Sequence, residues 1–168
     1  VNPRYAAIDG VACYPALKDL PEAPDCVDLL VSNDKLEATL AEAIAAHAKS
    51  VVIHDSCYLP NDRDPPLTKR LAAMAKAAGV HIMGGNCTGF MNLAERVRVN
   101  AYPPNHDMEA GHVTFISHSG STYGGLCRNE RRLRFNLLVS PGQEPTTTAA
   151  DYMDYALDLP STRVIALF

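Results

Sequence analysis

Short apolar runs rich in valine and isoleucine alternate along this chain with longer segments in which apolar residues recur at helical spacing. The segments CVDLLVS (26–32) and SVVIH (50–54) are nearly continuous apolar runs, as expected of strands that are covered on both faces. The segment between them has helical spacing, and Asp34 with Glu37 predicts a capping box at its start. This alternation is typical of βα units around a parallel sheet and predicts an α/β fold.

A second unit follows, and the pattern then restarts. Residues 67–78 form a predicted helix that is opened by Pro65 and Pro66 and closed by Gly79 before the strand VHIMG. Regularity fades from 84 to 111, and we place a linker at 92–107, between modules at 1–91 and 108–168. In the second module the pattern predicts strands at 112–117, 135–140 and 162–168, a helix that ends near residue 132, and a helix at 148–157.

Both ends of the chain resemble the interior of a domain. The chain opens in VNPRY, which resembles the tail of a strand, and it stops in VIALF, an apolar strand end with nothing after it to cover the sheet edge. We therefore expect both modules to be incomplete and the chain to be part of a larger protein.

The composition restricts the class of partner. The 168 residues include 15 Lys and Arg against 19 Asp and Glu, a net charge of −4, without the basic face that a duplex nucleic-acid binder needs. No apolar run approaches the roughly 18 residues of a membrane span, and the amino terminus does not resemble a signal peptide. Five cysteines and six histidines are scattered, without zinc-site or disulfide spacing. We therefore expect a cytoplasmic protein with no metal site and no nucleic-acid or membrane partner.

The segment ISHSGST (116–122) places small polar residues where a buried strand gives way to a helix. The first amides of a helix have no partner within it, and the helix dipole adds about half a positive charge there, so an anion binds well. Ser119, Gly120 and Ser121 are therefore candidate phosphate-binding residues. The alternatives are that Ser119 is only an N-cap, and that His118 is a general base, a phosphate acceptor or simply a polar loop residue.

The segment GGNCTG (84–89) also follows a predicted strand. Its glycines permit positive φ, Asn86 can bridge main-chain groups, and Cys87 stands where a following helix or turn could activate a thiol. A nucleophilic Cys87 needs a neighbouring base, and the sequence does not place His54 or His81 beside it. A small residue in a tight loop is the alternative interpretation.

Four segments, in this order, carry a resemblance to a known family: VNPRYAAIDGVACYPALKDLPEAPD, HIMGGNCTGFMN, GHVTFISHSGS and AADYMDYALDLPSTRVIALF. The typical family forms are V-N-P followed by G-x-x-C-Y-P-S-L, then G-P-N-C-x-G, S-Q-S-G and D-P-x-T-R-x-I. The chain resembles the NDP-forming acyl-CoA synthetases, which are relatives of the succinyl-CoA ligase α subunit. The resemblance implies part of a Rossmann-like CoA-binding domain over 1–91, followed by part of a flavodoxin-like parallel-sheet ligase domain over 108–168.

The same resemblance implies roles for individual residues. Those implied to bind CoA are Arg4, Ser32, Asn33, Ser56, Asn86 and Cys87. Arg4 would lie near the nucleotide end of CoA, and the serines and Asn33 would line a crevice at the carboxyl ends of two strands. Cys87 would lie where the CoA thiol meets the phosphohistidine loop. The residues that match the segment holding the transferring phosphate are Ser119, Gly120 and Ser121.

The implied activity is acyl-CoA synthesis from a carboxylic acid, CoA and ATP through acyl-phosphate and phosphohistidine intermediates. The phosphohistidine would follow Phe168, so the resemblance implies no catalytic residue within this chain. ATP and Mg²⁺ would bind an ATP-grasp domain or subunit outside it, and we also expect a homo-oligomer. His118 in place of Gln and Gly85 in place of Pro depart from the family forms. They leave a second hypothesis, a catalytically inactive, CoA-binding regulatory module fused to a protein acetyltransferase.

Overall fold

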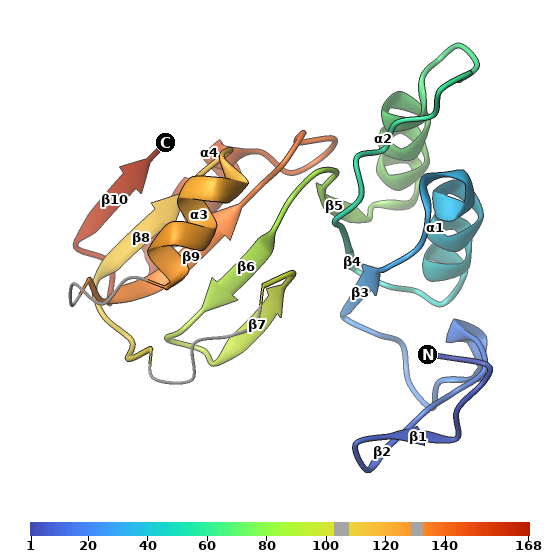
Figure 1. Ribbon diagram of the computed structural model, residues 1–168, viewed down its shortest axis with the longest axis horizontal. Coiled ribbons are helices and arrows are strands. Elements are labelled where there is room, and N and C mark those ends of the chain that lie inside the picture. The colour runs from blue at the N-terminus through green and yellow to red at the C-terminus, as the bar shows by residue number, and fades with distance from the viewer. Residues whose placement is uncertain (103–107, 129–132) are drawn as a thin grey trace.

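A computed structural model describes residues 1–102, 108–128 and 133–168, which form a mixed α/β structure (Figure 1). The first main sheet is parallel, with the order β3–β4–β5, and its strands are β3 (Cys26–Leu29), β4 (Ser50–Ile53) and β5 (His81–Gly84). Helices α1 (Leu36–Ala45) and α2 (Leu67–Ala78) pack on one face of this sheet through apolar residues at helical spacing. The predicted βα units are therefore confirmed.

Helix α2 begins and ends where its sequence predicts. Pro66 is the N-cap, and its fixed φ and missing amide hydrogen suit the start of a helix. Gly79 is the C-cap, with φ of 68°, a left-handed conformation in which glycine has no steric penalty.

Helix α1 starts differently from the prediction. The capping box expected from Asp34 and Glu37 is wrong, because a 3-10 turn at Asn33–Lys35 precedes the helix and Lys35 becomes its N-cap. The carboxylate of Glu37 is instead occupied by the Arg70 guanidinium of α2, which donates two hydrogen bonds of 2.9 Å. These bonds lower the pKa of Glu37 below its usual range and join the two helices in a bidentate ion pair.

The second main sheet is mixed, with the order β10–β8–β9–β6–β7. Strands β8 (Val113–Ile116), β9 (Phe135–Ser140) and β10 (Val164–Leu167) run parallel to one another, close to their predicted positions. Strands β6 (Gly89–Asn92) and β7 (Val97–Asn100) form an antiparallel hairpin that pairs with β9.

The β6–β7 hairpin corrects the prediction of irregular structure over 84–111, and β7 lies inside the predicted linker 92–107. Two physical reasons account for the error. Each strand has only four residues, too few for a period of two to stand out. The chain also reverses with Arg96 at φ of 58°, and no glycine or proline marks this turn in the sequence.

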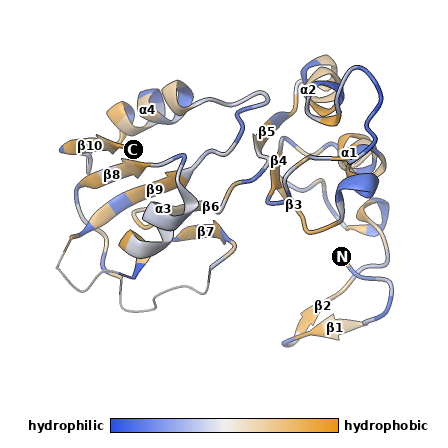
Figure 2. Cartoon of the chain, turned by 45° about the horizontal axis from the view of Figure 1, so that its top comes forward, coloured by the Kyte–Doolittle hydropathy of each residue, from blue (hydrophilic) through white to orange (hydrophobic). Residues whose placement is uncertain are grey.

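Helices α3 (Gly120–Cys127) and α4 (Ala149–Asp158) cover opposite faces of the second sheet (Figure 2). Phe115 of β8 packs with Tyr123 of α3, whereas the next residue, Ile116, packs in the cluster that contains Ala156 of α4. Successive strand residues point to opposite faces, so each helix has its own side. Helix α3 ends at Cys127, and residues 129–132 of the helix predicted there lie outside the described residues.

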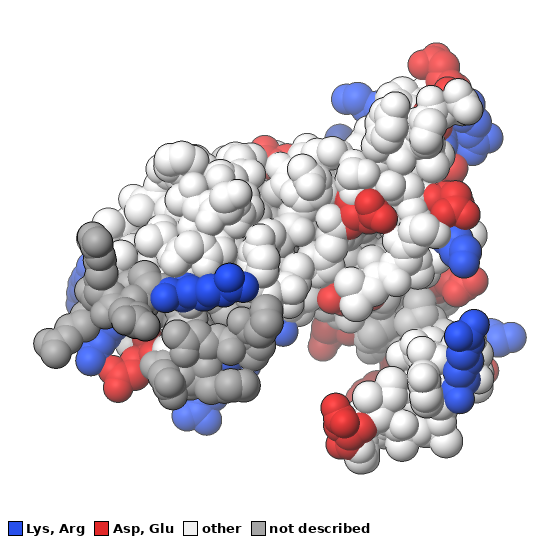
Figure 3. Space-filling view, viewed as in Figure 1, with Lys and Arg blue, Asp and Glu red and all other residues white. Residues whose placement is uncertain are grey.

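The two main sheets share an apolar junction. Val52 and Met83, on the face of the first sheet opposite α1 and α2, pack with Leu137 and Val139 of β9. In Figure 3 the charged side chains lie mainly around the margin of the molecule, with few over this junction. A separate hairpin, β1 (Ala7–Ile8) and β2 (Val11–Ala12), precedes the first sheet. Among the described residues, no helix is long and apolar enough to cross a membrane.

We expect Gly79→Ala to lower the free energy of unfolding by about 1 kcal/mol, because a side chain is disfavoured in the left-handed conformation. No atom lies within 4 Å of a Cβ built at Gly79, so the loss isolates the backbone effect. Gly125→Ala is the matched control, because a Cβ there also meets nothing within 4 Å but the residue lies inside α3. This change should stabilise the protein by about 0.5–1 kcal/mol. Urea unfolding followed by circular dichroism measures both, and an unchanged stability of Gly79→Ala would contradict the assigned cap.

Candidate functional site

Three of the residues implied to line a CoA crevice meet at the carboxyl ends of β3 and β4. Asn33 lies in the turn after β3, and its Nδ2 donates a hydrogen bond to Ser56 Oγ over 3.1 Å. Its Oδ1 accepts one from Cys57 N at 2.8 Å. Ser32 immediately precedes Asn33 and is exposed. Because doubly wound sheets bind ligands outside the carboxyl ends of their strands, this polar edge is well placed for a ligand.

The loop at residues 84–89 packs closely against the same edge. A Cβ on Gly84 or Gly85 would collide with the end of β4 or with the turn that follows it. Asn86 N donates to Asp55 O at 2.7 Å, and the Asn86 side chain is exposed. The loop therefore brings Asn86 beside Asp55, in the turn after β4 that also carries Ser56.

The loop after β9 holds the two sheets together at this edge. Gly84 N donates to Pro141 O at 3.0 Å, and Gln143 N donates to Gly85 O at 2.9 Å. The side chain of Gln143 also donates from Nε2 to Ser56 O at 2.9 Å. Sequence reasoning did not include this loop in the site, because the Pro-Gly dipeptide at 141–142 indicates a turn but not the segment that the turn contacts.

The start of α3 leaves backbone amides available to a ligand. Ser119 is the N-cap, and its Oγ accepts from Thr122 N at 3.2 Å. The amide of Ser119 donates to Ser117 Oγ at 3.1 Å. Within the described part of the chain, the amides of Gly120 and Ser121 have no partner, and Ser121 is exposed. Unpaired amides at a helix N-terminus suit an anion. Ser119 is therefore an N-cap, as the alternative interpretation held, but the amides of Gly120 and Ser121 remain available as donors to a ligand.

The helix start and loop 84–89 are neighbours. A Cβ built on Gly120 would lie 3.2 Å from Thr88 Cγ2, and Thr88 N donates to Ser140 Oγ at the end of β9 over 3.3 Å. The residues implied to hold phosphate therefore lie next to the loop that carries Asn86 and Cys87. The role of each residue in binding stays a prediction.

Arg4 is not joined to this group by any described contact. It lies in the exposed amino-terminal segment before β1, and its backbone amide donates to Asn2 Oδ1 at 2.9 Å. Its implied role at the nucleotide end of CoA therefore rests on the resemblance alone.

His118 is held by an acidic side chain beside the helix start. Its Nε2 lies 2.7 Å from Glu144 Oε1, and the same oxygen accepts from Ala149 N, the first residue of α4, at 2.8 Å. The imidazole is about half exposed. Glu144 thus orients His118 and links it to α4, a partner that sequence reasoning did not identify.

His54 lies beside Cys87, which the sequence could not establish. Its Nδ1 is 3.2 Å from Cys87 O and 3.9 Å from Cys87 Sγ, and its Nε2 is 3.1 Å from Asp28 Oδ1. Hydrogen bonding to Asp28, and then to Cys87, raises the pKa of His54 to about 10 against the opposing effect of burial. A histidine that is already charged has no lone pair with which to accept a proton. We therefore do not assign Cys87 as a nucleophile with His54 as its base.

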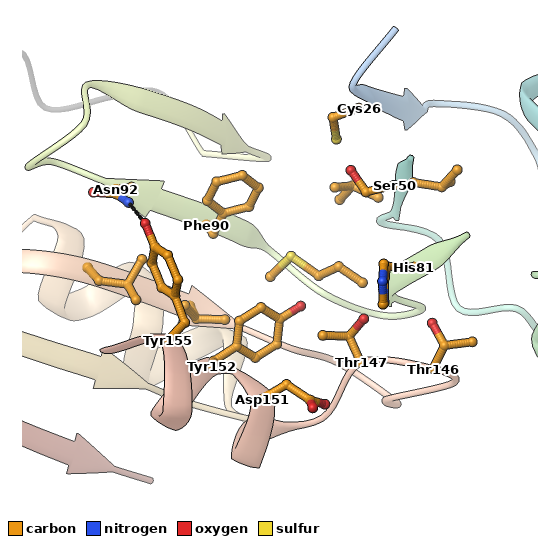
Figure 4. A pocket seen from close by; sticks show the side chains of 15 residues that line it. Cys26, Ser50, His81, Phe90, Asn92, Thr146, Thr147, Asp151, Tyr152 and Tyr155 are labelled. Atoms are coloured by element: carbon orange, nitrogen blue, oxygen red, sulfur yellow. Dashed lines mark hydrogen bonds between the residues drawn. The ribbon is translucent and has the colours of Figure 1, made fainter. Parts of the chain in front are cut away.

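A pocket of about 480 Å³ lies at the opposite end of the first sheet (Figure 4). Side chains at the first residues of β3, β4 and β5 line it, together with aromatic side chains from β6 and α4; the labelled members include Cys26, Ser50, His81, Phe90, Tyr152 and Tyr155. Because this pocket is at the amino ends of the strands, it is separate from the polar edge formed by Asn33 and Ser56 at their carboxyl ends. Among the described residues, no three His, Cys, Asp or Glu side chains are grouped to hold a metal ion.

Two protein families match successive parts of the chain. The CoA binding domain family matches residues 1–92, and the succinyl-CoA ligase like flavodoxin domain matches residues 110–168. The ADP-forming acetate–CoA ligase of Methanocaldococcus jannaschii is 27% identical over 175 residues, covering all of this chain and 24% of that protein. The α subunit of ADP-forming acetate–CoA ligase II of Pyrococcus furiosus is 28% identical over 171 residues, covering all of this chain and 37% of the subunit.

A solved structure shares the fold. It is the dinucleotide forming acetyl-coenzyme A synthetase 1 of Ca. Korarchaeum cryptofilum in complex with phosphate and ADP, with a TM-score of 0.88 and 26% identity. The match covers 99% of this chain and 36% of that one, so the chain spans about a quarter to two fifths of the length of the proteins it matches. The chain therefore belongs to the NDP-forming acyl-CoA synthetase family, as a CoA binding domain followed by a succinyl-CoA ligase like flavodoxin domain.

Proposed function

We propose that this chain is the CoA-binding and phosphoryl-handling portion of an acid–CoA ligase that forms ADP. The observation that carries this proposal is the proximity of Gly120, at the start of α3, to Thr88 in loop 84–89, where a Cβ built on Gly120 would lie 3.2 Å from Thr88 Cγ2. It makes the residues implied to hold phosphate neighbours of those implied to bind CoA. A reaction that passes through an acyl phosphate and ends in a thioester needs these two groups close together.

Each part of the site has a chemical task in this proposal. Asn33 and Ser56 offer polar groups to CoA in the crevice, and Asn86 offers its exposed side chain from the adjoining loop. The amides of Gly120 and Ser121 hold the phosphoryl group by neutral N–H donors and the helix dipole. Neutral donors fit a group that must leave again, because they bind it without a permanent protein cation.

The remaining machinery is proposed to lie outside this chain. The phosphohistidine would follow Phe168, and an ATP-grasp domain or subunit would supply the site for ATP and Mg²⁺. The acid substrate is a small carboxylic acid, in keeping with the names of the relatives. A cytoplasmic location and a homo-oligomeric assembly stay predictions. The relatives reported above give no support to the alternative of a regulatory module fused to an acetyltransferase.

Gly120→Pro is expected to abolish phosphoenzyme formation in the complete protein. Proline removes the Gly120 amide, although the first position of a helix tolerates it well. Labelling with nucleotide that carries a radioactive γ-phosphate measures the effect. Gly120→Ala is the matched control, because it keeps the amide and adds only a Cβ near Thr88. Undiminished labelling of Gly120→Pro would refute the phosphate site, and equal loss in both variants would assign the effect to crowding.

Arg4→Ala is expected to weaken CoA binding about tenfold, the value of one charge-assisted hydrogen bond to phosphate. Isothermal titration calorimetry with CoA measures the dissociation constant in the complete protein. Lys76→Ala is the control: it removes another exposed cation, in the last turn of α2, and should leave the affinity unchanged. Equal affinity of Arg4→Ala and the unaltered protein would remove Arg4 from the site.

A further inference from the structure

The ring of His54 lies between two hydrogen-bond acceptors on different parts of the fold. The Asp28 carboxylate, on β3, faces Nε2, and the Cys87 carbonyl, in loop 84–89, faces Nδ1. Neither a carboxylate oxygen nor a carbonyl oxygen donates a hydrogen bond. Both ring nitrogens must therefore be donors, which describes an imidazolium held between its two partners.

The charged state of His54 is consistent with its surroundings. Its side chain is 13% exposed, and the charged group that faces it is Asp28, while the Cys87 thiol is the other titratable group near the ring. Because the pKa of His54 rises to about 10 from an ordinary value of 6.5, the stability contributed by the pair is fully present below pH 6.5. That contribution is lost as the pH rises through about 10, so the pair is intact at neutral pH.

The hydrogen bond from His54 holds a part of loop 84–89, the Cys87 carbonyl, for which the described residues show no backbone hydrogen bond. Residues 84, 85 and 86 of the loop are held by main-chain hydrogen bonds to residues 141, 143 and 55. Thr88 O accepts from Ala101 N at 2.9 Å. The Cys87 carbonyl, between these two anchored stretches, is held by a side chain. The Cys87 thiol, whose Sγ lies 3.9 Å from His54 Nδ1, donates to Ile53 O at 3.3 Å.

We propose that His54 is a positioning residue for loop 84–89, oriented by Asp28 and donating from Nδ1 to the Cys87 carbonyl. Through this bond it fixes Asn86 on one side of Cys87 and Thr88 on the other, where the loop adjoins the crevice and the start of α3. For its effect on ligand binding the inference rests on the proposed function, in which the ligand is CoA. For its effect on the loop it rests on geometry alone.

Three substitutions at His54 separate positioning from mere packing. His54→Leu removes both donors. His54→Gln keeps one donor, an amide nitrogen at about the position of Nε2, which faces Asp28. His54→Asn keeps the other donor, an amide nitrogen at about the position of Nδ1, which faces the Cys87 carbonyl. We expect the Leu and Gln variants to bind CoA about tenfold more weakly in the complete protein, as for the loss of one hydrogen bond to a charged donor. The Asn variant should recover most of the affinity, whereas packing alone would make Gln and Asn equivalent.

A second measurement needs no CoA. The rate at which iodoacetamide alkylates Cys87, followed by peptide mass spectrometry, reports how firmly the loop is held over this buried thiol. We expect faster alkylation in the Leu and Gln variants and the unaltered rate in the Asn variant. His47→Asn is the control, since His47 is exposed and its φ of 60° suits asparagine; it should change neither measurement.

The outcomes of these two measurements are distinguishable. Equal alkylation rates in all three His54 variants and the unaltered protein, or an Asn variant as fast as the Leu variant, would overturn the positioning role. If the Leu variant does not fold, the comparison of Gln with Asn decides the matter. An unaltered protein that binds no CoA would refute the proposed function, and the alkylation rates would still decide whether His54 positions the loop.

Discussion

The arrangement of the site depends on the backbone hydrogen bonds between the loop after β5 and the loop after β9. Gly84 and Gly85 bond to Pro141 and Gln143, and Gly142, at φ of 73°, lies so close to Gly85 that no side chain fits there. These bonds add to the apolar packing between the two sheets and to the hydrogen bonds that Thr146 and Gln143, from the segment after β9, make with the backbone of Ile82 and Ser56. Since hydrogen bonds are directional and apolar contacts are not, the loops fix how the carboxyl edge of the first sheet is oriented relative to the second sheet.

Much of the fold follows from local sequence, and the errors have local causes. Gly79 predicted the end of α2, and apolar runs predicted the parallel strands, because backbone conformation and burial leave a direct signature in these residues. The capping box at Asp34 failed because Glu37 found a stronger partner in Arg70, 33 residues away. The β6–β7 hairpin was missed because its strands are short and its partner, β9, follows much later in the chain.

For the site as well, the sequence predicted local features but not partners that are distant in the chain. The resemblance gave Asn33, Ser56 and the segment at 119–121 as candidates; Asn33 and Ser56 hydrogen-bond to each other, and Gly120 lies beside Thr88 of loop 84–89. The sequence named His54 only as a base that it could not place beside Cys87, and it did not indicate Gln143, because the partners of both residues come from distant segments of the chain. His54 receives a carboxylate from β3 and a carbonyl from loop 84–89. No local sequence feature of a histidine at the end of a strand predicts that a carboxylate and a carbonyl from other segments will bond to its ring.

The mixed second sheet has a consequence for dividing the protein. Strand β9, the most buried strand, has β8 on one side and β6 on the other, and β6 follows β5 of the first sheet after a short loop. Cutting the chain within 92–107 would separate β6 from β9 and leave six buried residues along an open edge. An unprotected apolar edge invites pairing with other chains, so a fragment made this way would tend to aggregate, whereas a cut before β6 would keep the sheet whole.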